Sequence, residues 1–148
     1  MPPTFARTRT PPPWFRAIGV LFLVWGMAGV YAFYSHATLG PAGLAALPDY
    51  DRRFWLARPG WFDWVYAAAT WGGLLGSALM LAGRRWSAVL FGVSLMAVAV
   101  QFGWVFAATD LIAAKGALAT VPFPLVIFII ALLQLAIARR GVGRHWLR

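Results

Sequence analysis

Four long apolar runs alternate with short polar stretches along the chain. Each run is close to the roughly 20 residues that a helix needs to cross a bilayer core of about 30 Å. The organising run extends from Trp64 to Trp86, because the two arginines near its end leave only a tight turn before the next run. Short turns favour antiparallel neighbours, so the pattern predicts an all-α integral membrane protein, an antiparallel four-helix bundle. The predicted spans cover about residues 17–37, 62–82, 87–108 and 122–138.

The segments outside these runs are polar or broken by proline. Residues 1–16 combine five prolines with three arginines and no periodicity, which predicts a disordered tail. Residues 38–61 mix charges with aromatic side chains, which suits an outer interfacial loop carrying a two-turn helix that Asp49 caps and that ends before Pro59. Residues 141–148 form a basic tail.

The first apolar run has one alternative interpretation. Its basic leader and the small residues around His36 resemble a secretory signal with a cleavage site. A signal has an apolar core of only about 7 to 15 residues, and this run is longer and rich in Trp, Phe and Tyr. We therefore expect a retained membrane anchor.

The charge distribution predicts the orientation. The formal net charge is +9, from 13 basic and 4 acidic residues. With the N-terminus inside, nine basic residues flank the inner helix ends and four lie in outer loops, so the positive-inside rule predicts N-in and C-in. The residues that determine this topology are Arg84, Arg85, Arg139 and Arg140. All four carboxylates fall on the outer side, at Asp49, Asp51, Asp63 and Asp110.

Composition and charge exclude several classes of function. With 61% hydrophobic and 11% charged residues, the expected partner is the lipid bilayer and not nucleic acid. The chain lacks cysteine, and its two histidines fall on opposite sides of the membrane, so we expect no metal site and no cofactor. No acid or base is predicted inside the membrane, so we expect no enzyme. The absence of glutamate also argues against a proton-coupled exporter of the small multidrug type.

Four uncharged side chains at membrane depth are the candidates for a substrate path. Gln101 and Gln134 differ by about 9 Å in predicted depth, too far to share one hydrogen bond. Each is expected to bond to a neighbouring helix, and the alternative is a polar lining. Trp25 and Trp71 are the two of nine tryptophans nearest mid-bilayer, and either pack in the core or form a ligand platform.

Small residues mark the expected helix contacts. Gly72 and Gly76 form a GxxxG pair, and Gly73 with Ser77 repeats it one residue later. Gly26 and Gly29 offer a partner stripe on the first run, and the third run carries a further stripe at Gly92, Ala99 and Gly103. Packing within the chain is the simpler interpretation, and a dimer interface stays open.

The chain resembles a group of small four-helix inner-membrane proteins of proteobacteria that are commonly labelled "sugar transporter". The resemblance rests on LAALPDYDRRFWLARPGW, WGGLLGSALMLAGRRWS and LFGVSLMAVAVQFGW, and is best defined at Pro59-Gly60-Trp61, Gly72-Gly73 with Gly76-Ser77, and Arg84-Arg85-Trp86. It implies a transport role but supplies no binding residues.

Two hypotheses for the function follow. The first is a multi-pass inner-membrane transporter or transport component, with sugar as the substrate only by the label of the resemblance. The second is a structural or accessory protein that packs with or assembles a larger membrane complex, as a homo-oligomer or with another membrane protein.

Overall fold

The computed structural model describes residues 10–148, and these are all-helical, with no strand. Four of the helices are long and apolar enough to cross a membrane, which confirms the predicted four-helix membrane bundle. The long helices are α1 (Pro13–Ala37), α4 (Phe62–Leu81), α5 (Trp86–Ala108) and α8 (Pro122–Gly143). The short ones are α2 (Pro41–Ala46), α3 (Asp49–Ala57), α6 (Leu111–Lys115) and α7 (Ala117–Thr120).

Several boundaries differ from the predicted ones. Helix α1 begins at Pro13, where a missing N–H costs nothing, so the last four residues of the predicted tail are helical and residues 1–9 lie outside the described part. Residues 38–61 contain two short helices where one was predicted. Asp49 is the first residue of α3 and makes an ion pair with Arg52, and the residue at the cap position is Pro48.

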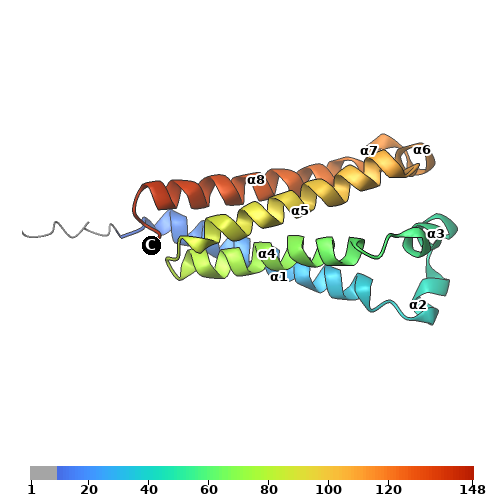
Figure 1. Ribbon diagram of the computed structural model, residues 1–148, viewed down its shortest axis with the longest axis horizontal. Coiled ribbons are helices and arrows are strands. Elements are labelled where there is room, and N and C mark those ends of the chain that lie inside the picture. The colour runs from blue at the N-terminus through green and yellow to red at the C-terminus, as the bar shows by residue number, and fades with distance from the viewer. Residues whose placement is uncertain (1–9) are drawn as a thin grey trace, which may run out of the picture.

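The four long helices pack in a row. Helix α4 packs against α1 on one side and α5 on the other, and α5 packs against α8. Figure 1 shows the α1–α4 pair and the α5–α8 pair meeting near the C-terminus and separating toward α2, α3, α6 and α7. We name these two ends of the molecule the terminal end and the loop end. Because α1 and α8 do not pack along their lengths, the bundle is open between them.

Glycines set the close approaches in this row. A Cβ at Gly26 would lie 2.7 Å from the Cα of Leu74, and one at Gly76 would lie 2.8 Å from the ring of Phe91. Gly72 lies against the α5 backbone, with a Cβ position 3.2 Å from the Leu90 carbonyl oxygen. Ser77 is fully buried and bonds back to its own helix. The predicted stripe on α5 behaves differently, because Gly92 and Gly103 meet nothing within 4 Å.

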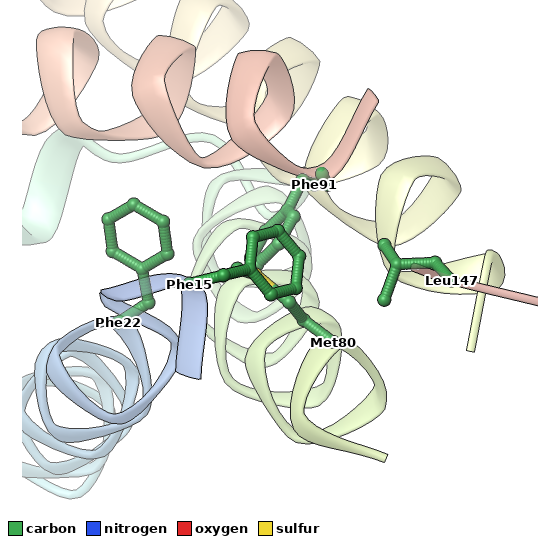
Figure 2. Close-up of a cluster of buried hydrophobic side chains, with 6 residues drawn as sticks. Phe15, Phe22, Met80, Phe91 and Leu147 are labelled. Atoms are coloured by element: carbon green, nitrogen blue, oxygen red, sulfur yellow. The ribbon is translucent and has the colours of Figure 1, made fainter. Parts of the chain in front are cut away.

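A hydrophobic core closes the terminal end (Figure 2). Side chains from α1, α4, α5, α8 and the C-terminal segment converge there, and the largest are almost fully buried. This cluster joins α1 to α8, which are separate elsewhere. Its members are Phe15, Phe22, Met80, Phe91, Ala138 and Leu147.

The C-terminal segment folds back onto this core. Helix α8 continues to Gly143, beyond the predicted end at 138, and the chain then turns through His145, which has a φ of 58°. The N–H groups of Trp146 and Leu147 both bond to the Gly141 carbonyl, at 2.9 and 3.2 Å. Residues 141–148, predicted as a basic tail, are therefore part of the packed structure.

Candidate functional site

A cavity of about 430 Å³ occupies the gap between α1 and α8. Its floor is formed by α4 and α5, and its volume lies within the roughly 300 to 1,000 Å³ typical of small-molecule sites. On α1 its lining extends from Trp25 to His36, which is about 16 Å at 1.5 Å per residue. We call it the central cavity. At the terminal end, the central cavity stops at the hydrophobic core.

Two glutamines form the polar part of the central cavity. Gln134 is 2% exposed and Gln101 is 8% exposed, and both line the cavity. Among residues 10–148 neither side-chain amide makes a hydrogen bond, and the Nε2 of Gln134 is buried without a partner. The bond to a neighbouring helix that the sequence favoured is therefore absent for both residues within the described chain.

The hydroxyls near these amides are already engaged. Ser94 Oγ donates to the Ala69 carbonyl at 2.6 Å across the α4–α5 contact, and Thr70 Oγ1 donates to the Tyr66 carbonyl at 3.1 Å. Gly73 lies between the two polar groups, since a Cβ there would be 3.6 Å from Ser94 Oγ and 4.0 Å from Gln134 Nε2. The glutamine amides are thus the main unused hydrogen-bonding groups deep in the cavity.

Only one of the two tryptophan candidates lines the central cavity. Trp25 lines the central cavity, whereas Trp71 is not part of its lining and has its ring 6.5 Å from that of Tyr34. The structure thus brings three of the four substrate-path candidates together, Trp25, Gln101 and Gln134, and leaves out Trp71.

Helix α3 lies across the loop end of the central cavity, where Phe54 is part of the lining. On the α1 side, Trp55 Nε1 donates to the His36 carbonyl at 3.3 Å, and Arg58 bonds to His36 Nε2. Arg58 also makes an ion pair of 3.2 Å with Asp63 and stacks 4.4 Å from the Trp55 ring. Desolvation lowers the pKa of Arg58 and the Asp63 carboxylate opposes that shift, so the guanidinium stays charged at neutral pH.

On the opposite side α3 is held to Asp110, which precedes α6, and to Lys115, the last residue of α6. Tyr50 donates its phenolic hydrogen to Asp110 at 2.9 Å, and Lys115 makes an ion pair with Asp51. Desolvation raises the pKa of Tyr50 above 10.0 and the bond to Asp110 raises it further, so the phenol keeps its proton at neutral pH. Side chains rather than close helix packing therefore hold α3 over the cavity.

His36, Phe54 and Tyr66 also line the cavity and were not among the predicted site residues. The mixture of charge and aromatic residues in 38–61 predicted an interface without indicating what it covers. Among residues 10–148 no group of three or more His, Asp or Glu side chains could hold a metal ion. No family model, curated protein or solved structure matches the chain.

Proposed function

We propose that this membrane protein binds a small amphiphilic molecule in the central cavity, as a transporter or a component of a transport system. The observation that carries the proposal is the buried, unpartnered amide of Gln134, which faces a cavity of about 430 Å³. An unmade hydrogen bond in a buried site costs about 1 to 3 kcal/mol. An occupant with an oxygen acceptor would recover that free energy.

The cavity walls favour a ligand that is mostly apolar. A sugar needs a partner for each of several hydroxyl groups, but Ser94 and Thr70 already donate to the backbone and His36 Nε2 is bonded to Arg58. Most other lining residues are aliphatic or aromatic, among them Trp25, Val98 and Ile127. Water could satisfy the amides but would gain little from these walls. The sugar substrate that the resemblance implies stays a prediction, and the lining supports a molecule with one or two carbonyl or hydroxyl groups.

The gap between α1 and α8 supports access from the lipid side or the loop end. The terminal end is closed by the core around Phe15 and Phe91. Transport across the membrane therefore requires either a second conformation of that core or a partner protein, which is why the proposal includes a transport component.

The proposed orientation places the terminal end in the cytoplasm and the protein in an inner membrane. It is supported by the arginines of that end, from Arg16, Arg84 and Arg85 to those after Ala138, whereas all four carboxylates lie at the loop end. Single cysteines in this cysteine-free chain test it: Arg144→Cys should resist an impermeant thiol reagent applied to intact cells, and Lys115→Cys should react.

Photolabelling with benzophenone tests ligand binding. Benzophenone has one carbonyl acceptor between two apolar rings, and on irradiation it inserts into nearby C–H bonds. In protein reconstituted in lipid nanodiscs, we expect mass spectrometry to find adducts on cavity-lining residues such as Val98 and Ile127. The variant Gly73→Leu should lose these adducts, because its Cβ fits at ordinary contact distance and the rest of the side chain fills the cavity.

Gly92→Leu is the matched control, because nothing lies within 4 Å of its Cβ position and it does not line the cavity. It should keep the cavity adducts. Adducts distributed evenly over the lipid-facing residues of all three proteins, or cavity adducts that persist in Gly73→Leu, would contradict the proposal.

One observation favours the accessory role as a second candidate. Gly92 and Gly103 leave room on the outward side of α5 for another helix to approach closely. Cross-linking through Gly103→Cys in native membranes tests this: a homodimer or a defined hetero-adduct supports an assembly role, and an uncross-linked monomer contradicts it.

A further inference from the structure

A second cavity, of about 440 Å³, lies at the terminal end and is separate from the central cavity. It is lined by the start of α1, the end of α4, the α4–α5 turn and the C-terminal segment. Arg16, Arg84 and Arg148 line its polar side. We call it the arginine pocket.

Two of the three arginines that line this pocket, Arg16 and Arg84, have no acidic partner among residues 10–148. The guanidinium groups of Arg16 and Arg84 make no ion pair or hydrogen bond among residues 10–148. At the loop end three of the four basic residues, Arg52, Arg58 and Lys115, are each paired with an aspartate, and Arg53 makes none of these ion pairs. Two unpartnered arginines beside one concave surface form a site for an anion, because a guanidinium donates two parallel hydrogen bonds to a phosphate.

Backbone hydrogen bonds hold the turn that carries Arg84 in place. The Arg148 N–H donates to the Gly83 carbonyl at 2.8 Å, and the Arg85 N–H donates to the Arg148 carbonyl. Gly83 has a φ of 72°, which lets the chain turn sharply after α4. The turn that presents Arg84 is therefore fixed to the C-terminal segment.

The other side of the arginine pocket is apolar. Phe15 and Met80 are almost fully buried in the adjoining core and also line the pocket, and the exposed side chain of Leu81 continues this apolar surface. Trp14 and Trp146 lie beside it with ring centroids 5.8 Å apart, in the kind of position that interfacial tryptophans occupy. A free phosphate would use only the arginines, whereas a phospholipid would use both sides.

We infer that the arginine pocket binds a phospholipid with an anionic head group from the leaflet at the terminal end. Its phosphate lies between Arg16 and Arg84, and its acyl chains lie against α1 and α4 beside Leu81. Basic pockets between membrane helices bind anionic head groups in this way. The site is independent of the central cavity, so it does not depend on the function proposed above.

Native mass spectrometry with defined lipids tests this inference. The purified protein in mild detergent is titrated with phosphatidylglycerol or with zwitterionic phosphatidylcholine. We expect one phosphatidylglycerol to bind preferentially. The double variant Arg16→Gln, Arg84→Gln should weaken its binding about 25-fold, since each arginine near a membrane surface contributes roughly fivefold. Arg16→Lys with Arg84→Lys should recover only part of the lost affinity, because the charge is retained but the paired hydrogen bonds to the phosphate are lost.

The matched control removes the same charge from the same end. Arg139 and Arg144 are exposed and do not line the pocket, so Arg139→Gln with Arg144→Gln should leave phosphatidylglycerol binding nearly unchanged. Equal weakening by the two double variants would overturn the site as a general effect of charge. Equal binding of phosphatidylcholine would overturn the selectivity, and competition by 10 mM inorganic phosphate would identify a site for a free anion instead.

Discussion

Gly26 of α1 lies directly against Leu74 of α4, at a point where a Cβ on the glycine would be 2.7 Å from the leucine Cα. The neighbouring atom is backbone and not a flexible side chain, so it cannot move aside without shifting a helix. This contact fixes how closely α1 approaches α4. Since α1 forms one wall of the central cavity, the contact between Gly26 and Leu74 also fixes the position of that wall.

Gly26→Ala should therefore separate α1 from α4. We expect a loss of about 1 to 3 kcal/mol in the free energy of unfolding, the usual cost of adding a methyl group to a packed contact. Thermal unfolding in detergent measures it. Gly92→Ala is the control, because its Cβ position is open and the substitution should cost nothing. Equal melting temperatures for Gly26→Ala and the wild type would show that the helices approach less closely than described.

Gln134→Leu should reduce ligand binding without reducing the stability of the protein. The leucine replaces a buried amide that has no partner, so the protein should become as stable as the wild type or more stable by about 1 to 2 kcal/mol. Its cavity photolabelling by benzophenone should fall, because the ligand carbonyl loses its donor. Thermal unfolding and adduct yield are measured on the same samples.

Ser94→Ala provides the contrast for Gln134→Leu. It removes a bond of 2.6 Å to the Ala69 carbonyl, and should reduce stability by about 0.6 to 2 kcal/mol. If Gln134→Leu were destabilising by a similar amount, the amide of Gln134 would have a partner in the native protein.

The membrane fold could be predicted from the sequence because length and hydropathy suffice for it. An uninterrupted apolar run of about 20 residues has few alternatives to a spanning helix. The turn at Arg84 and Arg85 is too short for anything except antiparallel neighbours, and α4 and α5 do pack together. The close contacts of Gly72 and Gly76 follow the same logic, since only small residues allow such an approach.

The central cavity could not be predicted, because it depends on which helices are not neighbours. Four helices in a row leave α1 and α8 apart, whereas the same hydropathy pattern fits a closed square of helices. The depth of Gln101 and Gln134 excluded a mutual hydrogen bond but not a shared cavity, and a cavity about 16 Å long contains a separation of about 9 Å. The packing of Leu147 against the core could not be predicted from the sequence either, since a short basic segment normally indicates a solvated tail.

Leu147→Ala should destabilise the terminal end. The side chain is 5% exposed and packs beside Gly141 in the core that joins α1 to α8. Truncation of a buried leucine costs about 2 to 5 kcal/mol, so we expect a clearly lower melting temperature. Leu118→Ala is the matched control, because Leu118 is 94% exposed. Unchanged stability of Leu147→Ala would mean that the C-terminal segment is not docked.

Release of α3 should open the central cavity at the loop end. Tyr50→Phe and Asp51→Asn together remove the bond to Asp110 and the ion pair with Lys115, which hold α3 to the start and the end of α6. In a chain that also carries Ala131→Cys in the cavity lining, a charged methanethiosulfonate reagent should then react about fivefold faster, as expected from the loss of two exposed polar contacts.

Arg53→Gln is the control for this release, since Arg53 is exposed on the same helix and makes none of the three ion pairs described for residues 10–148. It should leave the labelling rate of Ala131→Cys unchanged. A cysteine at Met96, which faces outward from α5, should stay unreactive to the charged reagent in every background because it lies in hydrocarbon. Identical rates at Ala131→Cys with α3 held and released would show that α3 does not limit the access of polar molecules to the cavity, which would contradict its assignment as the cover of the loop end.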